Sequence, residues 1–196
     1  RGIDGSACGV AYNCDLVTVR AAEDVVFSES REAKGVADAF NMAAKRADIK
    51  IISMSMGYPF YISQVADAVK NAADHGKLIF CAAGTSSKWT NWAWVAFPAS
   101  MPVVNGVTGI QDNLKVRCDI CHEGPQVDFV VVMEKGNNKL KALSLAMSGV
   151  SPSITGGSSA ATASMAGMAA MVWSKFPTKS SADILRILKA SSVNPD

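Results

Sequence analysis

A serine at the start of a small-residue, apolar segment is the strongest candidate for chemistry in this chain. Residues 157–167 read Gly-Ser-Ser-Ala-Ala-Thr-Ala-Ser-Met-Ala-Gly, and residues 148–157 are rich in Gly, Ser, Pro and Thr, which predicts a loop. The run that continues to Trp173 is almost all Ala, Met, Gly and Val, which predicts a helix buried on every side. Ser159 would then lie in the first turn, where backbone N–H groups lack intrahelical partners and the helix dipole is positive. Such donors can hold the charge that develops when a serine attacks a carbonyl group.

A Cys-x-x-Cys-His pattern at residues 118–122 is the second candidate. The spacing matches c-type haem attachment, and Cys118, Cys121 and His122 could instead supply three metal ligands. Because the pattern is short and no second Cys-x-x-Cys completes a zinc site, we favour a loop with two ordinary or disulfide-forming thiols. Cys8 and Cys14 are left open between paired and free. Five cysteines, an odd number, leave at least one outside any internal disulfide.

Length and composition limit the class of protein. A chain of 196 residues that is 49% hydrophobic predicts a single domain, residues 1–196, with a sizeable core. Lys and Arg number 19 against 17 Asp and Glu, which argues against a nucleic-acid partner because that needs a clustered basic face. The longest apolar run, 160–173, is broken by Thr, Ser and Gly, so no membrane span is predicted. The first residues are polar and Gly-rich with no Met, so we expect a piece of a longer protein.

Strand and helix patterns alternate along the chain. Apolar or β-branched runs predict strands at 16–20, 49–56, 78–83, 103–107 and 127–132. Apolar residues at helical spacing predict helices at 33–44 and 65–73, the second ended by Gly76, and a last helix begins at Ser180 with Asp183 in a capping box. This alternation predicts an α/β fold with a mostly parallel sheet and helices on both faces. Ligands of such sheets bind outside the carboxyl ends of the strands.

The serine segment resembles the serine motif of the subtilases, the subtilisin-like serine proteases, which reads Gly-Thr-Ser-Met-Ala-x-Pro-His-Val-Ala-Gly. The matching positions are Gly157, Ser159, Ala161, Ala166 and Gly167. The substituted ones are Ser158 for Thr, Ala160 for Met, and Ala163 and Ser164 for Pro-His. The resemblance implies that Ser159 is the nucleophile of a peptidase of the S8 type.

Further stretches resemble subtilase segments in family order, from about residue 9 to the C-terminus. Residues 9–20 resemble the segment after the catalytic-histidine helix, and 51–57 the strand that ends in the substrate-binding edge. Residues 80–85 resemble the strand that enters the oxyanion-hole residue, and 97–99 the family's Tyr-Pro-Ala. The resemblance implies a three-layer subtilisin-like fold and hydrolysis of peptide or protein substrates through an acyl-enzyme.

The resemblance also assigns roles to other residues. Thr85 stands where the family has its oxyanion-hole Asn, and its shorter hydroxyl implies a weakened oxyanion hole. The implied walls that clasp the substrate backbone and first side chain are Ser55, Met56 and Gly57, then Ala82, Ala83 and Gly84, with Ala96 at the pocket base. A small base residue favours a bulky apolar side chain before the cut bond. Trp89, Trp92 and Trp94 are interpreted equally as a local packing cluster or as an aromatic rim of this pocket.

The family's catalytic Asp and His motifs do not occur in these 196 residues. The only histidines are His75, interpreted as a cation at a helix C-terminus, and His122. A serine needs an adjacent base, so we expect an upstream segment, with or without a propeptide, to supply His and Asp. Two rivals remain: a pseudoprotease that binds peptides in the same cleft, and a redox or haem protein that uses Cys118, Cys121 and His122.

No cofactor is expected, although many subtilases bind structural calcium; no carboxylate cluster that would carry this property over is evident in the sequence. The resemblance favours a secreted or extracytoplasmic location.

Overall fold

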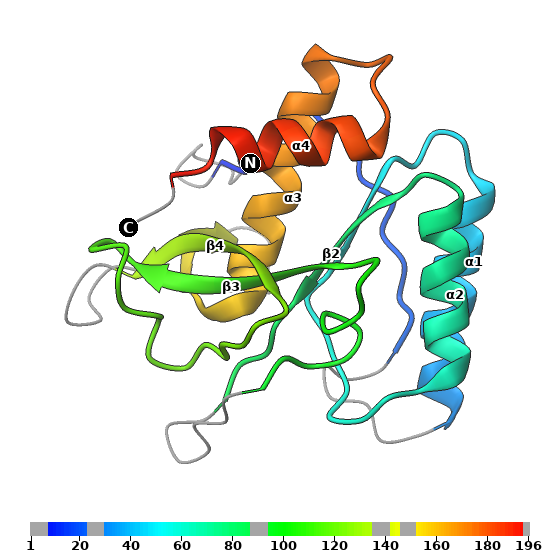
Figure 1. Ribbon diagram of the computed structural model, residues 1–196, viewed down its shortest axis with the longest axis horizontal. Helices are drawn as coiled ribbons and strands as arrows, with labels where there is room; N and C mark the ends of the chain where they lie inside the picture. The colour runs from blue at the N-terminus through cyan, green and yellow to red at the C-terminus, as the bar shows by residue number, and fades with distance from the viewer. Residues whose placement is uncertain (1–7, 23–29, 87–93, 135–141, 146–151, 194–196) are drawn as a thin grey trace.

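Four parallel strands form the central sheet of the computed structural model, which describes residues 8–22, 30–86, 94–134, 142–145 and 152–193 (Figure 1). The strands are β1 (Ile51–Met54), β2 (Leu78–Ala82), β3 (Asn105–Gln111) and β4 (Val127–Glu134), in the order β1-β2-β3-β4. Each neighbouring pair is parallel, as the alternating pattern predicts.

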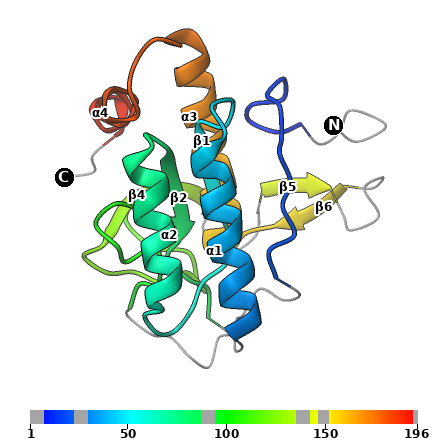
Figure 2. The same cartoon turned by 90° about the vertical axis from the view of Figure 1, so that its right-hand side faces the viewer.

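Helices cover both faces of the sheet and make three layers. Helices α1 (Ser30–Lys45) and α2 (Ser63–Asp74) lie together on one face, and α3 (Gly157–Lys175) with α4 (Ser181–Ser191) on the other (Figures 1 and 2). Alternate residues of the fully buried strand β2 enter the two cores: Ile79 and Cys81 pack with α1 and α2, whereas Leu78 and Phe80 pack with α3 and α4. The predicted fold class is therefore confirmed.

The predicted strand at 16–20 is wrong. Residues 15–22 have no regular structure, and Leu16 is 82% exposed. The Leu-Val-Thr-Val pattern has high β-propensity, but propensity describes how a residue fits a sheet and cannot supply a neighbouring strand. This segment instead passes close to α1, where a Cβ on Gly35 would lie 2.1 Å from the carbonyl oxygen of Ala21.

Two other boundaries differ from expectation. The segment 148–157, predicted to be a loop, contains strand β6 (Pro152–Thr155), which pairs antiparallel with β5 (Ala142–Leu145). Strand β3 begins at Asn105 rather than at 103, because the amide of Val104 donates to the carbonyl of Met101 in a turn. It then continues through Gly106 and Gly109, which the pattern of β-branched residues could not anticipate.

Helix α3 is not buried on every side. Its buried residues face the sheet, whereas Ala163 is exposed and Met171 is 48% exposed. Small side chains let the helix approach the sheet closely, but among the described residues only part of its circumference is covered. No helix in the described ranges is both long enough and apolar enough to cross a membrane.

Both predicted helix ends are confirmed. At the start of α4, the Ser180 side chain accepts from the Asp183 amide, and the Asp183 carboxylate accepts from the Ser180 amide, which is a capping box. After α2, Gly76 has φ +75°, the left-handed conformation that glycine tolerates best at this position.

We predict that Gly76→Ala lowers the free energy of unfolding by about 1 kcal/mol. A Cβ at Gly76 would meet nothing within 4 Å, so the loss would come from the backbone conformation alone. Urea unfolding measures it. Gly9→Ala is the matched control, because a Cβ there also meets nothing within 4 Å and the backbone is not left-handed. Equal losses for the two variants would contradict the prediction.

Candidate active site

Ser159 lies in the first turn of α3, beside the end of β1. Gly157, with φ +77°, leads the chain from β6 into the helix. The Ser159 hydroxyl donates to the Ser55 carbonyl at 3.4 Å, and the Ser55 hydroxyl donates to the Ser159 carbonyl at 2.9 Å. The predicted nucleophile and the first predicted wall residue are thus brought together, 104 positions apart in the chain.

Thr85 approaches the same helix start from the end of β2. Its hydroxyl lies 2.8 Å from the hydroxyl of Ser158, which is fully buried, and either oxygen can donate. The Ser158 carbonyl in turn accepts from the hydroxyl of Thr162 at 2.8 Å. The residue that stands for the oxyanion-hole Asn therefore contacts Ser158, the neighbour of Ser159. Rotation of the Thr85 hydroxyl decides whether its proton points toward Ser158 or away from it.

The predicted pocket walls lie side by side. The amide of Ala96 donates to the carbonyl of Ala83 at 2.8 Å, which joins the base to one wall. A Cβ on Gly57 would lie 3.0 Å from the Cβ of Ala96, which joins the base to the other. Ala82 and Ala83 are buried, whereas Gly84 is partly exposed with φ +125°. Of the remaining wall residues, Met56 packs against the core beneath α1 and α2.

The Cys-x-x-Cys-His loop lies against this site, and its two cysteines are buried although Asp119 between them is exposed. Cys118 and Cys121 form a disulfide, and the two residues are 0% and 1% exposed. The disulfide form was one of the alternatives favoured from the sequence. In this structure the disulfide joins both sulfurs that haem attachment would need. Cys8 and Cys14 are free and exposed, and burial raises the pKa of the free Cys81 thiol.

His122, which the sequence offered only as a haem or metal ligand, lies next to the candidate site. It is 6% exposed, and its Nε2 is hydrogen-bonded to the hydroxyl of Ser86. The ring of Trp94 lies 5.3 Å away, which places one of the three predicted tryptophans here. Trp89 and Trp92 lie outside the described residues. The Cys-x-x-Cys-His pattern drew attention to His122, which directly follows Cys121. No local pattern indicates that this loop pairs with residues 84–86.

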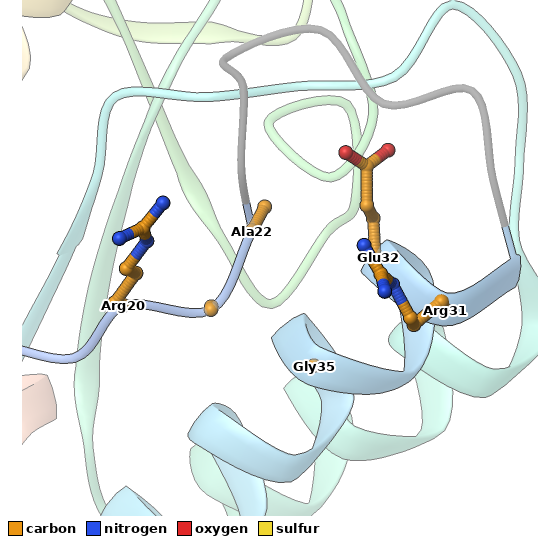
Figure 3. Close-up of a pocket in the computed structure, with 6 residues that line it drawn as sticks. Arg20, Ala22, Arg31, Glu32 and Gly35 are labelled. Atoms are coloured by element: carbon orange, nitrogen blue, oxygen red, sulfur yellow. The ribbon is translucent and has the colours of Figure 1, made fainter.

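Other titratable and concave features involve different residues. His75 lies at the C-terminus of α2, as expected, with its Nδ1 2.7 Å from the carbonyl of Asn71. A hollow of about 290 Å³ is lined by residues of α1 and of the segment before it, none of which belongs to the predicted site: Arg20, Ala21, Ala22, Arg31, Glu32 and Gly35 (Figure 3). Within the described ranges, no three His, Cys, Asp or Glu side chains gather closely enough to hold a metal ion.

Comparison with known proteins agrees with this geometry. The sequence profile described as the subtilase family matches residues 3–195. The chain belongs to the subtilase family. Subtilisin DY from Bacillus licheniformis is 26% identical over 186 residues, which cover 95% of this chain and 64% of that protein.

Solved subtilase-like structures share the fold. The S41 psychrophilic protease superposes with a TM-score of 0.65 and 25% identity, over 81% of this chain and 55% of that one. The prenylagaramide maturation protease PagA gives a TM-score of 0.69 with 19% identity, over 84% of this chain and 58% of that one. The chain therefore spans a little over half the length of these relatives.

We predict that the folded chain loses stability below about pH 6.5 because His122 becomes protonated. Burial lowers the pKa of His122 from its ordinary value of 6.5; hydrogen bonding to the Trp94 and Ala83 backbone opposes this shift, and the positive charge of Arg117 adds to it. The unfolded chain then binds a proton more readily than the folded one. The contribution of His122 to stability is therefore constant above about pH 6.5 and falls as the pH drops from about 6.5 toward the folded pKa. Thermal unfolding between pH 5 and pH 8 measures this.

Two variants separate His122 from the carboxyl groups that also titrate in acid. In His122→Asn, the part of the acid-side loss that belongs to the imidazole should disappear. His75→Gln should keep the full loss, because it leaves His122 in place. Identical pH profiles for His122→Asn and the unchanged protein would contradict the assignment.

Proposed function

We propose that this chain carries the nucleophile half of a serine endopeptidase that cleaves peptide bonds through an acyl-enzyme on Ser159. The observation that carries the proposal is the position of Ser159 in the first turn of α3, hydrogen-bonded to Ser55 at the end of β1, in a chain of the subtilase family. A helix start at the carboxyl ends of parallel strands offers both an open cleft and unpaired N–H donors.

In the proposed reaction, Ser159 attacks the scissile carbonyl and its proton passes to a histidine from a segment outside residues 1–196. An aspartate from the same segment orients the histidine. The proposal holds with or without a propeptide upstream. The Ser159 amide and the Thr85 hydroxyl hold the oxyanion. The histidine then gives its proton to the leaving amine. Water attacks the acyl-enzyme while the same histidine takes its proton, and that proton passes to the Ser159 oxygen as its bond to the acyl group breaks and the carboxylic acid product leaves.

The alternative is a pseudoprotease that binds peptides in the same cleft, and one contact favours it. The Thr85 hydroxyl is already hydrogen-bonded to buried Ser158, and whenever Thr85 is the donor in that bond its single proton does not serve an oxyanion. In subtilisin, the relative for which the loss of the corresponding donor has been measured, the rate falls about 10²–10³-fold. A protein with a weak donor can therefore retain binding while it loses most of its turnover.

The pocket walls support a substrate with a bulky apolar side chain before the cut bond. Gly57 and Ala96 carry almost no side-chain volume at the point where two walls meet, and Ala82 and Ala83 are apolar. The Cys118–Cys121 disulfide supports an extracytoplasmic location, because disulfides persist in oxidising compartments.

Fluorophosphonate labelling of the full-length gene product tests the proposal. We expect one label, mapped by peptide sequencing to Ser159, and its loss in Ser159→Ala. Ser164→Ala is the matched control, because Ser164 lies farther along the same helix and should leave labelling unchanged. A label on Ser86, whose hydroxyl is bonded to His122, would contradict the assignment of the nucleophile. No label, with retained binding of an apolar peptide by fluorescence anisotropy, would favour the pseudoprotease.

We also predict that Ala96→Val shifts cleavage toward smaller side chains before the cut bond. The added methyl groups would occupy the base of the pocket, where Ala96 is 7% exposed. For a large apolar side chain, kcat/KM should fall by about tenfold or more, since one or two methylenes are worth about 1–3 kcal/mol of discrimination. Cleavage profiling of a peptide library measures this, and a preference for charged residues in the unchanged protein would refute the apolar pocket.

A further inference from the structure

The disulfide loop 118–122 is anchored firmly to the sheet. The sulfurs pack on the backbone of β3, where a Cβ on Gly109 would lie 2.8 Å from the Cys121 sulfur and 3.3 Å from that of Cys118. The Cys118 amide donates to the Gly109 carbonyl at 3.0 Å. The Asp119 amide donates to the carboxylate of Glu134 on β4 at 3.1 Å, and Glu134 is 2% exposed. These contacts hold the loop against both β3 and β4.

The anchored loop pairs with the backbone on both sides of Thr85. Residues Thr85 and Cys121 form an antiparallel bridge. The His122 amide donates to the Gly84 carbonyl at 2.9 Å, and the Ser86 amide donates to the Ile120 carbonyl at 2.8 Å. The residues before and after the proposed oxyanion donor are therefore both fixed by this loop.

The His122 side chain adds a second connection across the same three residues. A Cβ on Gly84 would lie 2.2 Å from Nδ1, so only glycine leaves room for the ring there. Nε2 is bonded to the Ser86 hydroxyl, and the His122 carbonyl accepts from the Thr108 hydroxyl at 2.6 Å. The imidazole thus lies against Gly84 and holds Ser86, while its own backbone is tied to β3.

We propose that His122 is a positioning residue that fixes the Gly84–Thr85–Ser86 backbone and so directs the Thr85 hydroxyl toward the start of α3 beside Ser159. This inference rests on the proposed function, because it assigns Thr85 the oxyanion. His122 acts through Thr85 and does not touch the substrate. A donor that is fixed in place stabilises the transition state more than a mobile one, because no reorganisation is needed during the reaction.

The test is a double-mutant cycle on the full-length gene product with an apolar peptide substrate. His122→Ala should lower kcat by about tenfold to about hundredfold with little change in KM, because the oxyanion forms only in the transition state. In a Thr85→Val background, the same change should have almost no further effect on kcat. His75→Ala is the matched control and should leave both constants unchanged.

Two outcomes would overturn the inference. Additive losses of kcat from His122→Ala and Thr85→Val would show that His122 does not act through Thr85. A rise in KM at unchanged kcat would instead indicate a binding role. If His122→Ala fails to fold, Ser86→Ala removes only the bond to Nε2, and it should lower kcat in the same direction and lose its effect in the Thr85→Val background.

Hydrogen exchange distinguishes failure of this inference from failure of the proposed function. A full-length protein that takes no fluorophosphonate label would refute the protease. Even then, exchange of the Ser86 amide should be slow in the unchanged protein and at least tenfold faster in His122→Ala if the side chain holds this backbone. An unchanged exchange rate would refute the positioning role whether or not the protein is active.

Discussion

The contact between the start of α3 and the ends of β1 and β2 is the constraint on which the rest of the site depends. Two side chains from the strand ends make it: the Ser55 hydroxyl donates to the Ser159 carbonyl, and the Thr85 hydroxyl is bonded to that of Ser158. Within α3, the Thr162 hydroxyl donates to the Ser158 carbonyl. Ser158 is fully buried, and a buried hydroxyl without a partner costs about 1–3 kcal/mol. The same bond that stabilises the helix start therefore also determines where the Thr85 hydroxyl points.

The proposed mechanism gives the Thr85 hydroxyl two tasks. It is hydrogen-bonded to Ser158 in the free protein, and its single proton can serve the proposed oxyanion only while Ser158 is the donor in that bond. A hydroxyl can rotate between two partners, whereas a carboxamide has two N–H donors and can serve both at once. In the proposed mechanism, the strength of the oxyanion hole therefore depends on the Thr85 side chain and on the backbone that carries it.

The resemblance and the periodic patterns predicted much of the fold. Helices α1, α2 and α4 follow from apolar spacing, Gly76 and the Ser180 capping box, and strands β1, β2 and β4 follow from their apolar runs, although of these three only β2 is buried along its whole length. The failures share one cause. Residues 16–20 have the composition of a strand and find no partner in the described sheet, while residues 152–155 have the composition of a loop and pair with β5. Strand formation is decided by a neighbour that can be far away in the chain.

The sequence by itself determined the family and the candidate nucleophile. The small residues around Ser159 form a contiguous motif, and the other resembling segments follow in the family's order along the chain. The sequence left Cys118 and Cys121 open between ordinary and disulfide-forming thiols, and the structure shows that they form a disulfide. Only the tertiary structure decided that the disulfide loop lies along residues 84–86 and that His122 reaches Ser86. The physical reason is that these contacts cross between β2 and the loop after β3, and the register of such a pairing depends on how the strands and helices pack, which no local pattern encodes.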